Sequence, residues 1–349
     1  MAFDVLVISN LVYELNQTIL NAKISKIAQP ENDELLFTCK GSNGQFRLAM
    51  SASASLPFLY LTGQNKPSPM TAPNFCMVLR KHIANGRIVK IYQPHMERII
   101  HFDIEHLDEM GDLCRKTLIV ELMGKHSNII FCNDQGKIID SIKHVSAQMS
   151  SVREVLPGRE YFIPDTMQKV DPLTVTSEEF AAHLTGKPMP LAKAIYTSFT
   201  GISPVTAEEI CSLAGMDSSV PAQEYSADIL LHLYTQFEIY LSAIKEDTFS
   251  PGIYFDGKEP KEFSALPLSH FVNYTRVEYD SVSEVLETYY STRSLITRIR
   301  QKSVDLRHVV QTALERNRKK YDLQLRQLKD TENREKFKVY GELINTYGY

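Results

Sequence analysis

Residues 98–131 read RIIHFDIEHLDEMGDLCRKTLIVELMGKHSNIIF and contain three short β-like runs separated by polar residues. The runs 98–105, 116–122 and 127–131 are rich in β-branched and aromatic residues, which is typical of strands that bury at least one face. Consecutive strands joined by short connections pair in antiparallel fashion. This stretch therefore predicts an antiparallel meander.

The same pattern continues on both sides of this stretch. Asn133-Asp134-Gln135-Gly136 is a strong hairpin turn that leads into one more β run. Amphipathic periodicity predicts helices over 4–21 and 73–84. The further β runs are 23–29, 35–40, 45–51, 58–61, 87–92 and 137–143. Residues 1–165 are therefore expected to form one α+β domain.

The rest of the chain is mostly helical in pattern. A helical domain is expected over 176–250, then a small β excursion and linker over 251–281, and then a long helix over 282–349. The predicted helices are 177–184, 191–198, 207–214 and 226–245, and the β runs of the excursion are 252–255 and 262–266. No Pro or Gly interrupts 282–340, and an imperfect apolar stripe runs along it.

A lone helix of that length needs a partner to cover its apolar stripe. We therefore expect residues 282–349 to be the first half of a coiled-coil arm, cut partway through a helical hairpin. In isolation the stripe is expected to pair with a second copy of the chain, giving a dimer through the coil.

Charge is unevenly distributed along the 349 residues. The formal net charge is −4, but residues 291–340 hold 14 Lys or Arg against six acids, whereas the remainder carries −12. A basic helix on an acidic body attracts phosphates, because the local field rather than the average charge acts on a ligand. The alternative is an ordinary solvated helix face.

Several classes of protein are disfavoured by what the sequence lacks. The five cysteines show no CxxC spacing and no pairing with histidine at a metal spacing, so no metal and no cofactor are expected. GxGxxG, GxxxxGK[ST], HExxH and GxSxG are absent, so we expect no enzyme. No apolar run is long enough for a membrane span, and no signal peptide is evident, which favours a cytoplasmic protein.

Two local features could bind an anion. Glu97 and Arg98 precede a predicted strand, where a carboxylate can orient a guanidinium toward phosphate; the alternative is a surface ion pair worth about 0–1 kcal/mol. The tip ELMGKHSN (121–128) offers donors from Lys125, His126, Ser127 and Asn128. Its alternative is a plain turn with Gly124 at positive φ.

A third feature is FTGISPVTAEEI (199–210), which resembles a helix-hairpin-helix. In such a motif, backbone N–H groups at the start of the second helix hold a phosphate, here beside Gly201 and Ser203. The sequence has Ser203-Pro204 where the usual hairpin has a second glycine. Packing alone is the alternative explanation.

These features occur together in one family. The phrases PNFCMVLRKH (73–82), Glu97-Arg98, ELMGKHSNII (121–130), LPGREY (156–161), GISP (201–204) and GELI (341–344) resemble the NFACT family, whose bacterial members include RqcH-like ribosome quality control proteins, earlier labelled fibronectin-binding protein A. The resemblance implies an N-terminal domain similar to that of formamidopyrimidine-DNA glycosylases, then a helix-hairpin-helix domain and a coiled-coil arm.

The resemblance also implies a function. Family members bind large ribosomal subunits obstructed by peptidyl-tRNA, and they recruit alanyl-tRNA for untemplated alanine addition, which marks the stalled chain for degradation. The family's tRNA-binding Asp-Arg pair falls on Glu97 and Arg98, with Glu in place of Asp. The coil is expected to face ribosomal RNA through Arg316, Arg318, Lys319 and Lys320.

There are two alternatives to this function. A DNA glycosylase-like repair protein would share the fold, but the chain begins Met1-Ala2-Phe3 without the family's proline nucleophile, and it lacks a zinc-finger cysteine set. A fibronectin-binding surface adhesin would need an export signal, and none is evident.

Overall fold

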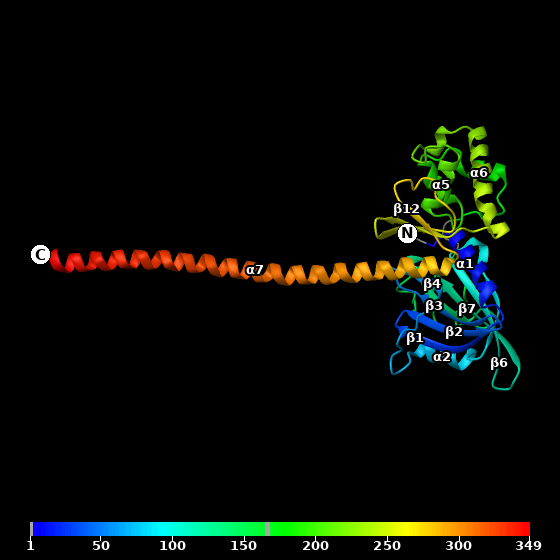
Figure 1. The fold of residues 1–349 in the computed structure, drawn as a ribbon, viewed down its shortest axis with the longest axis horizontal. Coiled ribbons are helices and arrows are strands. Elements are labelled where there is room, and N and C mark those ends of the chain that lie inside the picture. The colour runs from blue at the N-terminus through cyan, green and yellow to red at the C-terminus, as the bar shows by residue number, and fades with distance from the viewer. Residues whose placement is uncertain (1–2, 165–167) are drawn as a thin grey trace. The chain divides into compact units, whose positions relative to one another are not determined.

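The computed structural model describes residues 3–164 and 168–349 (Figure 1). Its contacts divide the chain into two units, Met1–Ser291 and Thr292–Tyr349. None of the helices in these described ranges combines the length and the apolar character that crossing a bilayer requires.

The first unit is built on a large sheet. Within the described residues, nine strands form one antiparallel sheet in the order β4-β3-β2-β1-β5-β6-β7-β8-β9. Every β run that the sequence predicts between residues 23 and 143 becomes one of these strands, so the α+β prediction is confirmed. The elements are α1 (Val5–Thr18), β1 (Lys23–Glu31), β2 (Glu34–Gly41), β3 (Gly44–Ser51), β4 (Phe58–Thr62), α2 (Asn74–Ile83), β5 (Arg87–Tyr92), β6 (Ile99–Leu107), β7 (Leu113–Glu121), β8 (Asn128–Cys132) and β9 (Ile138–Ser141).

Strand β6 separates two hydrophobic clusters, because its side chains alternate between the faces of the sheet. Ile100 and Phe102 join the larger cluster, to which α1 and α2 also contribute. Ile99 belongs to a smaller cluster that includes Val155 and Tyr161 from the segment after β9. The side chains of Ile99 and Ile100, directly after Arg98, therefore pack on opposite faces of the sheet.

Four helices and a small sheet complete most of the first unit. They are α3 (Ser177–Leu184), α4 (Leu191–Ser198), α5 (Pro204–Leu213), α6 (Ala227–Glu246), β10 (Gly252–Asp256), β11 (Glu259–Ser264) and β12 (Thr275–Glu278). Helix α5 begins three residues earlier than predicted, because Ser203 caps it and Pro204 suits the first helical position. Strand β12 was not predicted, since it is short, mostly exposed and at the edge of its sheet.

Helix α7 spans Val282–Tyr347, so the uninterrupted helix predicted over 282–340 is confirmed. Its first turns belong to the first unit and are fixed by polar contacts. The Glu14 carboxylate accepts hydrogen bonds from the Ser281 and Ser283 hydroxyls, and Thr62 Oγ1 donates to Glu287 Oε1 at 2.5 Å. A carboxylate at a helix N-terminus also interacts favourably with the helix dipole.

The second unit, taken by itself, consists of the remainder of α7. Large apolar side chains such as Leu306, Val309 and Leu325 are exposed along it. The four basic residues predicted to face ribosomal RNA (Arg316, Arg318, Lys319 and Lys320) are exposed as well. A partner helix over the apolar stripe, and the division of the chain into the four predicted segments, stay predictions.

Candidate nucleic-acid interface

The loop that carries Glu97 and Arg98 has an unusual backbone. It lies between β5 and β6 and contains one turn of 3-10 helix, Pro94–Met96. His95 and Met96 adopt positive φ values of 47° and 56°. For residues other than glycine this conformation costs about 1–2 kcal/mol each, and it persists only where the surroundings enforce it. Such strain is often found where side chains are held for binding.

Contacts from two directions hold this loop. The Gln93 amide nitrogen donates to the Glu97 carbonyl at 2.9 Å, while its oxygen accepts from the Ser9 hydroxyl of α1 at 2.7 Å. On the other side, a Cβ added to Gly201 would lie 2.4 Å from the Met96 carbonyl oxygen. The loop is therefore held in place by a hydrogen bond to α1 on one side and by close packing against the turn that joins α4 to α5 on the other.

Arg98 is half-buried, so part of its side chain is exposed to solvent. Its backbone carbonyl accepts from the Leu122 N–H at 2.9 Å. Within residues 3–164 and 168–349 its guanidinium makes no hydrogen bond or ion pair. Burial lowers the pKa of Arg98, and the negative charges of Glu97 and Asp4 oppose that shift. A half-buried cation in this state is ready to accept an anion.

The turn at Gly201 brings the two halves of the first unit together. Gly201 has φ +73°, and its carbonyl accepts from the Val5 N–H at 2.9 Å. The predicted Gly201 contact to phosphate stays a prediction. Glycine is required here, because the left-handed conformation and the close approach of Met96 both exclude a side chain.

The Ser203 side chain caps helix α5. Its hydroxyl accepts from the Thr206 N–H at 3.1 Å and so caps α5. The Asp4 carboxylate, which caps α1 through the Val7 N–H at 3.0 Å, also accepts from Thr206 Oγ1 at 2.5 Å and lies 3.3 Å from Ser203 Oγ. The Asp4 carboxylate of the same chain therefore lies near the start of α5. The predicted phosphate contact of the backbone beside Ser203 stays a prediction.

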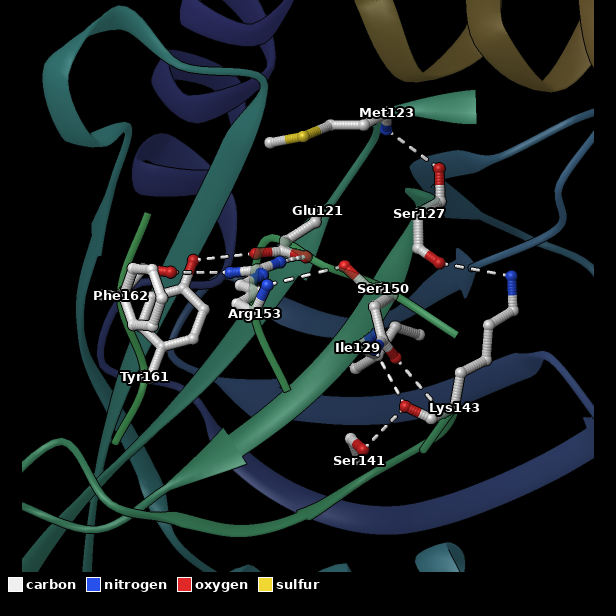
Figure 2. Close-up of polar contacts among 11 residues, drawn as sticks. Glu121, Met123, Ser127, Ile129, Ser141, Lys143, Ser150, Arg153, Tyr161 and Phe162 are labelled. Carbon is white, nitrogen blue, oxygen red and sulfur yellow. Dashed lines mark hydrogen bonds and ion pairs between the residues drawn. The ribbon is translucent and has the colours of Figure 1, made fainter. Parts of the chain in front are cut away.

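The tip 121–128 has an exposed turn next to buried residues, and Figure 2 shows the hydrogen bond between Met123 and Ser127 within it. Lys125 and His126 lie in an exposed 3-10 turn, Gly124–His126. Ser127 and Asn128 are 1% and 3% exposed. The Ser127 hydroxyl accepts from the Met123 N–H at 2.8 Å, and Asn128 bonds both backbone polar groups of Lys143. This corrects the prediction that Ser127 and Asn128 face a ligand.

Sequence analysis missed a buried charged cluster next to this tip. Glu121 is fully buried, with Arg153 Nη2 at 2.5 Å from its Oε2 and the Tyr161 hydroxyl donating to its Oε1 at 2.9 Å (Figure 2). Arg153 also donates to the Phe162 carbonyl at 2.7 Å. Because Glu121 pairs with Ile99 across the sheet, the cluster fixes the strand ends beside Arg98. The only sequence signal was an acid inside the apolar run LIVEL.

No group of three or more His, Cys, Asp or Glu side chains that could hold a metal is found among the residues that the structure describes. The site therefore consists of a strained loop, a half-buried arginine and a glycine turn. Such an arrangement suits recognition of a phosphate or a base edge through charge-assisted hydrogen bonds.

The structure thus defines an α+β protein in which the loop carrying Arg98 lies between α1 and the turn that joins α4 to α5. Residues 4–349 match the family model described as NFACT N-terminal and middle domains, so the chain belongs to the NFACT family.

Among curated relatives, the Rqc2 homolog RqcH of Bacillus subtilis is 34% identical over 351 residues, covering 100% of this chain and 59% of the relative. The Rqc2 homolog RqcH of Streptococcus pneumoniae is 30% identical and covers 99% of this chain and 58% of the relative. The chain thus spans less than two thirds of the length of these relatives.

Solved structures show the same fold. The fibrinogen binding protein from Staphylococcus aureus has a TM-score of 0.71 at 29% identity, covering 83% of this chain and 99% of that one. The N-terminal part of the fibronectin/fibrinogen-binding protein from Streptococcus suis has a TM-score of 0.67 at 29% identity, with the same coverage.

Proposed function

We propose that this chain is the RNA-binding part of a ribosome quality control factor. The factor binds large ribosomal subunits obstructed by peptidyl-tRNA and recruits alanyl-tRNA for alanine tailing of the stalled chain. The observation that carries this proposal is Arg98, a half-buried cation without a protein partner in the described ranges, at the position of the family's tRNA-binding pair. The names of the curated relatives support it.

The finer architecture belongs to the same proposal. The sheet and its helices correspond to an N-terminal domain like that of formamidopyrimidine-DNA glycosylases, α4 and α5 form the helix-hairpin-helix, and α7 is one strand of a coiled coil that can also pair with a second copy. Exposed cations along α7 contact ribosomal RNA by neutralising phosphates. The factor works in the cytoplasm and is not itself an enzyme, because the ribosome forms the peptide bonds.

Replacing Arg98 by alanine is expected to weaken tRNA binding by about tenfold to a hundredfold. Hydrogen bonds to charged groups contribute about 1.5–3 kcal/mol, and each 1.4 kcal/mol is a factor of ten in affinity. The free energy of unfolding should change by no more than about 0.5 kcal/mol, since the guanidinium has no partner to lose within the described residues. Filter binding of labelled tRNA and thermal melting measure the two effects.

Arg87→Ala is the matched control, because Arg87 is an exposed arginine on the neighbouring strand β5. It should leave tRNA affinity within about twofold of the wild type. Equal tRNA affinities for Arg98→Ala and the wild type would remove Arg98 from the site, whereas loss of binding together with a much lower melting temperature would make Arg98 a structural residue.

A second function is suggested by the names of the solved structures, which describe binding of fibrinogen or fibronectin. Binding of the purified protein to immobilised fibronectin tests it directly. We favour the ribosomal function, because an arginine at the end of a strained loop, with no partner for its guanidinium among the described residues, fits a phosphate ligand. Tight fibronectin binding with no measurable tRNA binding would reverse this choice.

A further inference from the structure

A second cation lies close to Arg98 and has no assigned role. Lys169 precedes Val170, whose N–H donates to the Ser198 carbonyl and whose carbonyl accepts from the Thr200 N–H, each at 2.9 Å. These bonds attach the segment to the end of α4, one residue before Gly201. Because Gly201 lies against Met96, the backbone brings Lys169 to the loop that carries Glu97 and Arg98.

The charges around Lys169 agree with this placement. Burial lowers the pKa of Lys169, the positive charge of Arg98 lowers it further, and Glu97 opposes the shift. In the ranges 3–164 and 168–349 the Lys169 ammonium makes a hydrogen bond to a backbone carbonyl but no ion pair. Two partly buried cations attached to neighbouring backbone segments, with Glu97 as the acid near both, form a site of positive charge that favours binding of a further anion.

The alternative role for Lys169 is to cap a helix. Its ammonium donates to the Tyr196 carbonyl of α4 at 2.8 Å, which satisfies one orphan carbonyl near the helix C-terminus. Lys187 approaches the same helix end, where it donates to the Ser198 hydroxyl at 2.7 Å. An ammonium has three donors, so the Tyr196 bond leaves two N–H groups of Lys169 for a ligand.

We propose that Lys169 and Arg98 bind one RNA backbone phosphate between them. Arg98 supplies the planar donor fork, and Lys169, whose ammonium is held by the Tyr196 carbonyl, supplies a point charge from the segment attached to α4. The proposal rests on the proposed tRNA-binding function and deepens it, because it adds a residue from the helical half of the unit to a site that otherwise lies in the loop before β6.

The test measures the dissociation constant of the complete chain for deacylated tRNA at several salt concentrations. Lys169→Gln should weaken binding on the order of tenfold and reduce the slope of log Kd against log salt by about 0.7–0.9, the value for one phosphate contact. Lys169→Arg, which keeps the cation, should retain most of the affinity. Lys193→Gln is the matched control, because Lys193 is an exposed lysine on α4; it should leave the salt slope unchanged.

The double variant Arg98→Gln with Lys169→Gln tests whether the two cations share a phosphate. The tRNA affinity of the double variant should be close to that of whichever single variant binds tRNA more weakly, since the loss of either cation already breaks the shared contact. If the fold losses in tRNA affinity of the two single variants multiply in the double variant, the two cations do not share a phosphate.

Three other results would also overturn the proposal. An unchanged salt slope for Lys169→Gln with a lower melting temperature would leave Lys169 as a helix cap only. An unchanged affinity for Lys169→Gln while Arg98→Gln weakens binding would refute the pair but keep the proposed function. No tRNA binding by the wild type would refute both.

Discussion

Arg153→Ala is expected to lower the free energy of unfolding by about 3–5 kcal/mol, the range for removing one partner of a buried ion pair. Glu121 is fully buried, and Arg153 is the cation that lies 2.5 Å from its carboxylate. Without Arg153, only the Tyr161 hydroxyl would still donate to Glu121 in the part of the chain that the structure describes. A buried carboxylate with one neutral donor is strongly disfavoured. Urea denaturation of wild type and variant measures the difference.

Arg115→Ala provides the control for this experiment. Arg115 pairs with Glu105 at 2.8 Å, but its side chain is 54% exposed, so its loss should cost no more than about 1 kcal/mol. The combination Arg153→Met with Glu121→Met should recover much of the lost stability, because no uncompensated charge remains. If Arg153→Ala were no more destabilising than Arg115→Ala, the Glu121 cluster would not hold the strand ends together.

The sheet could be predicted because its signal is local. Each strand from β1 to β9 is a short run of β-branched or aromatic residues bounded by turn residues, and sequential neighbours pair. The tip 121–128 shows the limit of this reasoning. Its composition correctly indicates a polar turn, but burial of Ser127 and Asn128 depends on Lys143, which lies fifteen or more residues further along the chain.

The candidate site could be predicted only in part, because most of its contacts join distant residues. The positions of Glu97 and Arg98 follow from the family phrase, but Asp4 meets Ser203 and Thr206 across a separation of about 200 residues. In the sequence Asp4 is a single acid before an apolar segment, which gives no indication of a contact so far along the chain. Lys169 carried no sequence signal, since a single lysine in a polar connection is common and its relation to Arg98 exists only in the folded chain.

Gly201→Ala is expected to lower the free energy of unfolding by about 3 kcal/mol and to weaken tRNA binding as well. Its Cβ would lie 2.4 Å from the Met96 carbonyl oxygen and 2.9 Å from Val5 Cβ, and the residue has φ +73°. Overpacking costs about 1–3 kcal/mol, and a left-handed alanine costs about 1–2 kcal/mol more. The melting temperature should fall by roughly 5 °C for a unit of this size.

Gly215→Ala separates the two causes, because Gly215 also has positive φ, at +67°, yet a Cβ there would meet nothing within 4 Å. It should cost only the conformational part, about 1–2 kcal/mol, and leave tRNA affinity unchanged. The difference in the free energy of unfolding between Gly201→Ala and Gly215→Ala therefore measures the steric cost of the close packing between the Gly201 turn and Met96. If that packing positions Arg98, Gly201→Ala must lose tRNA affinity even at temperatures where it is fully folded. Equal affinities of the two variants there would mean that the loop holds Glu97 and Arg98 without the helical half of the unit.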